Sequence, residues 1–237
     1  MTIKIIQGHN HTLGASRINV IIDVIRAFTV AHYAFIKGVQ GIILAGTLDD
    51  AFRLKRQFPE FILAGEIQGL PIAGFDLDNS PVRLQNADLR GKFLIQKTTN
   101  GVKATLNSLN ADHIFVTGFT NARTTAEFIK HKLLREDTAI SIHLIASHPS
   151  GDDDLACAQY ISGILQNSNR ISADETIERI RKSEAAKKFY DPAKPDFLQE
   201  DIGLCTRELS SEFVMKVNYK DELPLIEKVQ VQELNHE

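Results

Sequence analysis

Short apolar runs alternate with helical hydrophobic patterns along most of the chain. Ile18–Ile25 is almost entirely apolar and β-branched, which is typical of a strand buried on both faces of a parallel sheet. Similar runs predict strands at Ile3–Ile6, Gly41–Ala45, Phe61–Ala64, Phe93–Gln96, His113–Thr117 and Ala139–Ala146. Helical patterns lie between them at Ala27–Lys37, from Thr47 to near Phe58, and at Val102–Leu109, Thr124–Leu134 and Leu155–Leu165. This alternation predicts an α/β protein with a mostly parallel sheet and helices on both sides.

The C-terminal part of the chain has a different pattern. Residues 167–189 are highly charged and helical. Beyond them we expect a stiff connection, a short helix and two strands, at Asp191–Pro195, Phe197–Cys205, Phe213–Val217 and Leu225–Val231. The length suits one domain over residues 1–237, in which residues 167–237 form an extension packed on the rest.

The stretch Ala64–Pro81 (AGEIQGLPIAGFDLDNSP) combines glycines, prolines, acids and amides directly after a predicted strand. Glu66 stands where that strand is expected to end. Carboxylates at the carboxyl ends of strands in open α/β sheets face the crevice where ligands bind. The alternative is an ordinary surface loop, because Gly, Pro, Asn and Asp also dominate turns for purely conformational reasons.

Polar clusters follow other predicted strands as well. They are Asp23 with Arg26 and Thr29, Thr98–Gly101, and Asn121 after Gly118, in addition to Glu66 with Asp76, Asn79 and Ser80. Because the carboxyl ends of parallel strands lie at one edge of a sheet, we expect these clusters to converge.

The residue types in these clusters suit a small, multiply anionic ligand. Asp23, Glu66 and Asp76 offer hard oxygens to Mg²⁺, which prefers one or two carboxylates plus waters and substrate oxygens. Arg26 offers a planar fork for a phosphate or sulfonate. The Thr98–Gly101 turn, before a predicted helix, presents N–H groups and hydroxyls to an anion. Phosphoryl transfer requires mainly such positioning and charge neutralisation.

Each of these clusters also has a structural interpretation. Thr98–Asn100 can simply cap the helix that follows. Asp23 and Arg26 can form a structural ion pair. His148, which follows a predicted strand, can serve as an acid or base or be an exposed turn residue.

The composition narrows the classes of function. The chain is 43% apolar and 24% charged, as in ordinary globular proteins. Its net charge of −3 argues against nucleic-acid binding, which favours basic surfaces. No apolar run approaches the ~20 residues that cross a bilayer, and no secretory signal is recognisable, so we expect a cytoplasmic protein without membrane association. The sequence carries neither a dinucleotide-binding nor a P-loop motif, and its two cysteines lack CxxC spacing.

Several motifs occur in a defined order along the chain. They are DVIRAFT (Asp23–Thr29), AGE (Ala64–Glu66), GFDLDNSP (Gly74–Pro81), TTNG (Thr98–Gly101), the Gly118–Asn121 turn, DDLACA (Asp153–Ala158) and the segment SEAAKKFYDPAKPDFLQEDIGLCT. This ordered set resembles the 2-phosphosulfolactate phosphatase (ComB-like) family. The resemblance implies a three-layer α/β/α fold with a mostly parallel, mixed sheet. It also implies a Mg²⁺-dependent phosphatase that converts 2-phosphosulfolactate to sulfolactate, on the route to coenzyme M.

The residues and the resemblance together define the expected site. We expect catalysis from Asp23, Arg26, Glu66 and Asp76, and Mg²⁺ binding by Asp23, Glu66 and Asp76. We expect the substrate to contact Arg26, Thr29, Asn79, Ser80, Thr98, Thr99, Asn100, Gly101 and Asn121. Asp23 is either a nucleophile or only a metal ligand, although activation of water by the metal is the simpler mechanism. The expected partner is a small anionic phosphorylated substrate. A homodimer is one oligomeric state that we consider for the chain.

The sequence departs from the family pattern at several positions. Phe28 stands where the family usually has Thr, and Asp78 where it usually has Gly. The SHPSGDDD segment and Gln159 also differ, which affects the exact substrate more than the chemistry. A non-catalytic binder of sulfonated or phosphorylated metabolites therefore stays open, as does a lyase or mutase acting on a phosphorylated hydroxy acid.

Overall fold

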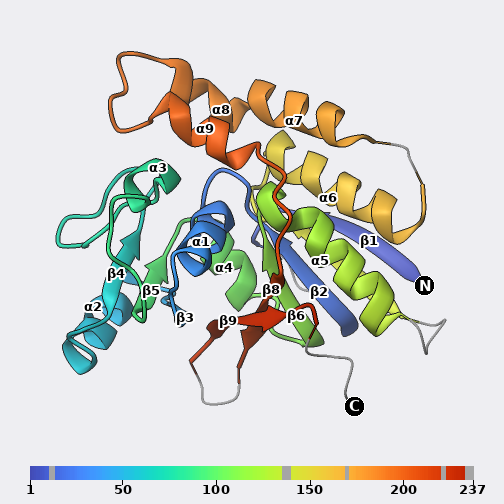
Figure 1. Cartoon of the computed structure of the whole chain (residues 1–237), viewed down its shortest axis with the longest axis horizontal. Helices are drawn as coiled ribbons and strands as arrows, with labels where there is room; N and C mark the ends of the chain where they lie inside the picture. Colours follow the sequence, from blue (N-terminus) through green and yellow to red (C-terminus); the bar gives the residue numbers. More distant parts are fainter. Residues whose placement is uncertain (11–13, 135–139, 169–170, 220–222, 233–237) are drawn as a thin grey trace.

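The computed structural model describes residues 1–10, 14–134, 140–168, 171–219 and 223–232. In this part of the chain, one nine-stranded sheet has the strand order β1-β7-β2-β6-β8-β9-β3-β5-β4, with helices on both faces (Figure 1). The strands are β1 (Thr2–Gln7), β2 (Ser16–Ile22), β3 (Gly41–Leu44), β4 (Ile62–Gly65), β5 (Phe93–Lys97), β6 (Ala111–Thr117), β7 (Ser141–Ala146), β8 (Phe213–Asn218) and β9 (Leu225–Gln230). The predicted three-layer α/β/α class with a mixed sheet is confirmed.

The sheet consists of two parallel blocks joined by an antiparallel hairpin. Strands β1, β7, β2 and β6 pair in parallel, as do β3, β5 and β4. The β8–β9 hairpin pairs antiparallel with β6 on one side and with β3 on the other. The two strands predicted near the C-terminus therefore connect the blocks.

The helices cover both faces of this sheet. They are α1 (Ala27–Ile36), α2 (Leu48–Gln57), α3 (Pro81–Leu84), α4 (Gly101–Leu106), α5 (Ala122–Phe128), α6 (Asp152–Leu165), α7 (Ala173–Lys182), α8 (Glu184–Lys187) and α9 (Gln199–Cys205). Shorter turns are the 3₁₀ segments η1 (Phe119–Asn121) and η3 (Lys188–Tyr190) and the π-helical segment η2 (Ile129–Leu133). None of the described helices is long and apolar enough to cross a membrane.

Strand β2 explains why the sequence shows a continuous apolar run there. Ile18, Val20 and Ile22 belong to the core under α5 and α6, whereas Ile21 belongs to the core under α1. Successive side chains of a strand point to opposite faces, so a strand covered on both sides is apolar at most positions; the buried Asn19 is the exception within the run, and its side-chain amide donates a hydrogen bond to the Ser108 carbonyl oxygen. The strand ends at Ile22, and Asp23 is the first residue beyond it.

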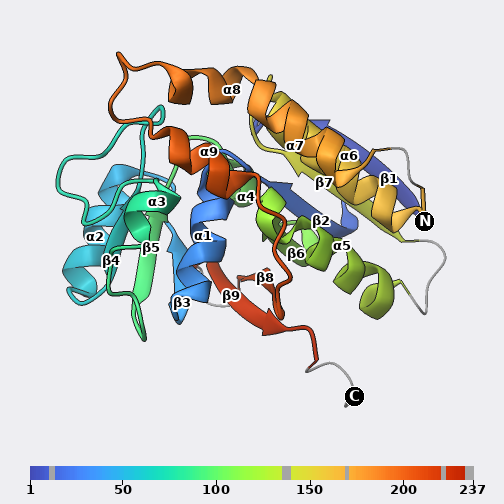
Figure 2. The same cartoon turned by 45° about the horizontal axis from the view of Figure 1, so that its top comes forward.

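Helices α7, α8 and α9 form a band across the top of the molecule in Figure 1, and this band comes forward in Figure 2. Helix α7 packs on α6, which covers the first parallel block, and α9 packs on α3, which lies in the chain between β4 and β5 of the second block. The band therefore bridges the two blocks near the ends of their strands.

Some predicted boundaries differ from the structure. Helix α6 begins at Asp152, three residues before its predicted start, so the aspartates expected in a loop form its first turn. Residues 82–92, a mostly polar segment for which no strand or helix was predicted, bury Leu84 and Leu89 in the core. The predicted first residue of β7, at position 139, and residues 169–170 lie outside the described residues.

Candidate active site

A cavity of about 530 Å³ lies where strands of both blocks end. Its lining comes from the segments that follow β2, β4, β5 and β7, together with the α8–η3 segment. The lining includes Asp23, Arg26, Glu66, Gly69, Asn79, Thr99, Asn100, His148, Lys188 and Phe189. Six residues predicted from the strand-end clusters, Asp23, Arg26, Glu66, Asn79, Thr99 and Asn100, are thus brought to one cavity.

Asp23 is a buried carboxylate at the end of β2, with 6% of its surface exposed. Its Oδ1 accepts a hydrogen bond from Ala27 N at 2.9 Å, and its Oδ2 accepts one from Ser147 Oγ at 3.1 Å. Burial, reinforced by the nearby Asp154 carboxyl, raises the pKa of Asp23 to about 7. Gly101 leaves room for this side chain, because a Cβ there would lie 2.7 Å from Asp23 Oδ2.

Asp153 and Asp154 are two further buried carboxyls, in the first turn of α6. Asp154 Oδ1 accepts a hydrogen bond from Val24 N at 2.8 Å, and its Oδ2 accepts bonds from Ser147 Oγ and His148 N, both at 3.0 Å. Asp153 Oδ1 is buried and has no hydrogen-bond partner among the described residues. Burial raises the pKa of both carboxyls well above the usual carboxyl range, reinforced by repulsion from Asp23 at Asp153 and from Asp153 at Asp154.

Our sequence reasoning did not assign these two aspartates to the site. The available signal was three consecutive acids directly before a helical pattern, within and just before the DDLACA motif. Acids favour a helix N-terminus for electrostatic reasons alone, so the run had a sufficient structural explanation.

Glu66 follows β4 and ties the β4 and β5 loops together. Its Oε1 accepts a hydrogen bond from Thr99 N at 2.5 Å, while its Oε2 accepts one from Thr99 Oγ1 at 2.9 Å and another from Gly69 N. The residue before Glu66 is Gly65, and a side chain at this position would clash with β5. A Cβ on Gly65, which has φ +152°, would lie 1.9 Å from the carbonyl oxygen of Lys97 on β5.

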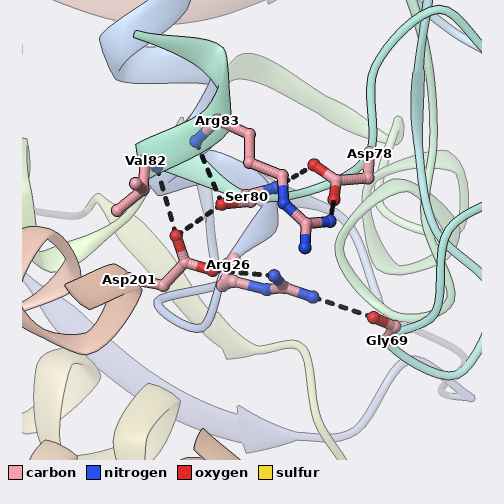
Figure 3. A network of polar contacts seen from close by, with 7 residues as sticks. All are labelled: Arg26, Gly69, Asp78, Ser80, Val82, Arg83 and Asp201. Carbon is pink, nitrogen blue, oxygen red and sulfur yellow. Dashed lines mark hydrogen bonds and ion pairs between the residues drawn. The ribbon is translucent and has the colours of Figure 1, made fainter. Parts of the chain in front are cut away.

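Arg26 lines the cavity, but its guanidinium is already engaged. Nη1 donates to Asp201 Oδ2 at 2.9 Å and Nη2 donates to the Gly69 carbonyl oxygen at 2.8 Å (Figure 3). The guanidinium carbon also lies 4.9 Å from the ring centroid of Phe189 and 5.7 Å from that of Phe197. The alternative of a structural ion pair between Asp23 and Arg26 is therefore wrong in its partner, because Arg26 forms its buried ion pair with Asp201.

Asp201 is the centre of a polar network between α9 and α3. Its Oδ1 accepts hydrogen bonds from Ser80 Oγ at 2.6 Å and from Val82 N at 3.1 Å (Figure 3). Arg83, on the same short helix, pairs with Asp78. Sequence reasoning missed Asp201, because an acid in the first turn of a short helix gives no sign of a partner so distant along the chain.

Several predicted substrate-binding residues do not line the cavity: Thr29, Ser80, Thr98, Gly101 and Asn121. Thr29 Oγ1 donates to the Val24 carbonyl oxygen at 2.8 Å. Thr98 Oγ1 accepts a hydrogen bond from Val102 N at 3.1 Å, which is the helix-capping arrangement considered above. Asn121 is fully buried behind these residues at the end of β6. These side chains support the fold around the cavity.

Asp76 also lies outside the cavity lining. Its Oδ2 accepts hydrogen bonds from Leu63 N at 2.8 Å and from Lys55 Nζ at 3.1 Å. The structure therefore does not bring Asp76 together with Asp23 and Glu66. Within the described ranges, no group of three His, Cys, Asp or Glu side chains is arranged to hold a metal ion.

The neutral polar groups of the cavity are Asn79, Asn100 and His148. Asn79 is 4% exposed, and its Oδ1 has no hydrogen-bond partner in the described part of the chain. His148 is half-buried, and its Nδ1 accepts a hydrogen bond from Ser150 N at 3.2 Å, which leaves Nε2 to carry the proton of the neutral ring. Burial, together with the Lys188 ammonium, lowers the pKa of His148, so the ring is neutral at pH 7.

Comparison with known proteins identifies the class to which this fold and cavity belong, a family of phosphoric monoester hydrolases. The chain belongs to the 2-phosphosulpholactate phosphatase family, whose model matches residues 4–220. The resemblance seen in the motifs is thereby confirmed.

Individual relatives agree with this assignment. The chain is 56% identical over 229 residues to a protein of Bacillus subtilis (strain 168) named "Probable 2-phosphosulfolactate phosphatase", covering 97% of this chain and 99% of the relative. Proteins with the same name are 37% identical in Caldicellulosiruptor saccharolyticus, over 60% of this chain and 59% of the relative, and 31% identical in Clostridium perfringens (strain 13 / Type A), over 80% and 81%.

Proposed function

We propose that this protein hydrolyses the phosphate ester of 2-phosphosulfolactate, or of a similar small anionic phosphomonoester, in the cavity between the two blocks. The observation that carries the proposal is the convergence of a buried carboxyl, Asp23, and two cationic side chains, Arg26 and Lys188, on one cavity in a member of this family. A substrate with phosphate, sulfonate and carboxylate groups needs several positive partners, and phosphoryl transfer depends on neutralising that charge.

Magnesium dependence is part of the proposal. The residues fit a divalent cation in one respect: Asp23 and Asp153 are buried carboxyls that repel each other, and Asp153 Oδ1 lacks a hydrogen-bond donor in the described chain. Mg²⁺ is commonly held by one or two carboxylates together with waters and substrate phosphate. We therefore assign Mg²⁺ to Asp23 and Asp153, in place of the set with Glu66 and Asp76. When bound, it would supply charge neutralisation for the transferring phosphoryl group.

The chain's own residues supply the positioning. Glu66 uses its oxygens to hold Thr99 and Gly69, so in this account it fixes the cavity wall rather than the metal. Asn79 offers an amide whose oxygen has no hydrogen-bond donor among the described residues. Neutral His148 offers its Nε2–H as a hydrogen-bond donor to the leaving alkoxide oxygen.

The two alternative functions receive no specific support. The binder hypothesis depended on Phe28 and Asp78. Phe28 is fully buried in the core, and Asp78 pairs with Arg83 outside the cavity lining. A cytoplasmic location, a role in coenzyme M biosynthesis and a homodimer stay predictions from the sequence.

The test is a phosphate-release assay across small anionic phosphomonoesters, with Mg²⁺ or with excess EDTA. We expect release from 2-phosphosulfolactate only when Mg²⁺ is supplied. Identification of the organic product by NMR separates hydrolysis from a lyase or mutase reaction. Full activity in EDTA would contradict the metal assignment, and no release from any phosphomonoester would contradict the function.

A further inference from the structure

Lys188 is the cationic residue of the cavity that contacts aromatic rings but has neither a hydrogen-bond acceptor nor an ion-pair partner among the described residues. It begins η3, and its Nζ lies 4.6 Å from the ring centroid of Phe197 and 5.8 Å from that of Phe189. Arg26, the other cation of the lining, is paired with Asp201. Lys188 makes neither a hydrogen bond nor an ion pair with another described residue.

The surroundings make this arrangement costly unless an anion arrives. Lys188 is half-buried against aromatic rings, and burial lowers its pKa, as does the Arg26 guanidinium. Glu66 and Asp153 favour its charged form from a distance, but neither accepts a hydrogen bond from it. The adjacent Lys187 shows the ordinary alternative, because it is solvent-exposed and paired with Glu184. An anion in the cavity would give Lys188 the partner that the chain does not provide.

The loop after β4 is shaped to admit this ammonium group. A Cβ on Gly69 would lie 2.8 Å from Lys188 Nζ and 2.8 Å from the Phe197 ring. Gly69 has φ +86°, a conformation that favours glycine, and its N–H and carbonyl are bonded to Glu66 and Arg26. The same residue therefore fixes the cavity wall and keeps open the space in front of Lys188.

Lys188 and the carboxyls come from different elements around the cavity. Asp23 follows β2 and Asp153 lies in the first turn of α6, and the reacting phosphoryl group belongs beside these carboxyls if they hold Mg²⁺. Lys188 belongs to η3, where its Nζ lies beside Gly69 and the rings of Phe189 and Phe197. We propose that Lys188 binds the acidic group of the substrate that is not hydrolysed, its sulfonate or carboxylate, and so determines specificity. This inference rests on the proposed phosphatase function.

The kinetic test compares two substrates in three variants. Lys188→Met keeps the unbranched stem over the aromatic rings and removes the charge. Lys188→Gln is measured in parallel and replaces Lys188→Met if the Tm of that variant is lowered. Lys182→Met is the matched control, since Lys182 is exposed, pairs with Glu178 and does not line the cavity. The substrates are 2-phosphosulfolactate and ethyl phosphate, which has no second acidic group.

We expect the Lys188 variants to raise KM for 2-phosphosulfolactate by about ten- to a hundredfold, the loss typical of one charge-assisted hydrogen bond. Their kcat, and their kcat/KM for ethyl phosphate, should stay close to the wild-type values, and Lys188→Arg should recover part of the lost affinity. Equal losses of kcat/KM on both substrates would overturn the proposal and would indicate that Lys188 contacts the phosphoryl group instead. Unchanged KM for 2-phosphosulfolactate would overturn it as well.

A binding measurement separates this inference from the phosphatase function. Sulfolactate binding is measured by calorimetry with wild type, Lys188→Met and Lys182→Met. If wild type releases no phosphate but binds sulfolactate at least about tenfold more tightly than Lys188→Met, the proposed reaction fails and the role of Lys188 stands. Equal binding by wild type and Lys188→Met, or no binding by wild type, would overturn the role of Lys188.

Discussion

Arg26 Nη1 and Asp201 Oδ2 lie 2.9 Å apart in the protein interior, with side-chain exposures of 4% and 0%. This ion pair joins the segment after β2 to α9. It orients a guanidinium that lines the cavity, and it attaches the C-terminal band to the rest of the fold (Figure 3). One contact thus serves both the site and the stability of the chain.

Removal of Asp201 should therefore destabilise the protein strongly. Asp201→Ala leaves a buried guanidinium without its carboxylate and also leaves Ser80 Oγ and Val82 N without their acceptor. We expect a loss of about 3–5 kcal/mol, or roughly 6–20 °C in Tm. Glu200→Ala, an exposed acid on the same helix, should stay within about 0.5 kcal/mol of wild type in the same urea and thermal unfolding series. Equal stability of the two variants would show that the Arg26–Asp201 pair contributes nothing to the free energy of unfolding.

Glu66→Gln should destabilise the metal-free protein. Both oxygens of Glu66 accept backbone N–H groups, so either orientation of a Gln amide places its NH₂ against an N–H donor. We expect a cost of about 1–3 kcal/mol in EDTA, measured by urea unfolding. Glu60→Gln, on the exposed turn before β4, is the control and should be neutral. A neutral or stabilising Glu66→Gln would instead indicate a repelled carboxylate that a cation normally relieves.

His32 predicts how stability depends on pH away from the cavity. It is fully buried on α1, with Nδ1 2.8 Å from Thr120 Oγ1, and burial lowers its pKa from 6.5 to about 4. Between these values the unfolded chain holds the proton and the folded chain does not, so stability is lost as pH falls from 6.5 toward 4. The shift corresponds to about 3 kcal/mol.

The measurement is the free energy of unfolding at pH 7 and pH 4. The free energy of unfolding of His32→Gln should fall less between pH 7 and pH 4 than that of wild type. The variant His131→Gln, at an exposed position, should show the same fall as wild type. An unchanged slope in His32→Gln would mean that other groups cause the acid sensitivity.

Two glycines should respond in opposite directions to alanine. Gly101→Ala places a methyl group 2.7 Å from Asp23 Oδ2 and 3.0 Å from the Cβ of Ala27, so we expect lower stability and loss of most activity. Gly203 lies within α9, with nothing within 4 Å of an added Cβ. Gly203→Ala should gain about 0.5–1 kcal/mol from helix propensity and keep full activity. Similar Tm values for the two variants would contradict the packing around Asp23.

The sequence predicted the fold correctly where the local hydrophobic pattern and the tertiary environment favour the same element. The apolar run of β2 reflects burial on both faces. The helical pattern predicted from Thr47 corresponds to α2, which Thr47 caps by accepting a hydrogen bond from Asp50 N. The β8–β9 hairpin was predicted as strands, but its place between the two blocks depends on pairings between distant segments.

The site could be predicted only in part, because contacts between segments that are distant in the chain leave no local pattern. Asp23 and Glu66 follow strands and reach the cavity, because strand ends are visible in the sequence. Asp76 belongs to the cluster predicted after the same strand as Glu66, yet its carboxylate accepts hydrogen bonds from Lys55 and Leu63 instead. Asp201 and Lys188 come from the C-terminal band, whose position over the cavity is set by packing on α3 and α6 rather than by any local pattern.

The most direct test of the account is kcat/KM for phosphate release from 2-phosphosulfolactate, measured with Mg²⁺ for wild type, Asp23→Asn and Asp76→Asn. Asp23 lies in the cavity and Asp76 lies outside it, although both carboxylates follow strands in the sequence. The account predicts a loss of about a hundredfold or more in Asp23→Asn and a change of less than about threefold in Asp76→Asn, with similar Tm values. Retained activity in Asp23→Asn with a loss in Asp76→Asn would contradict the assignment of the reaction to this cavity.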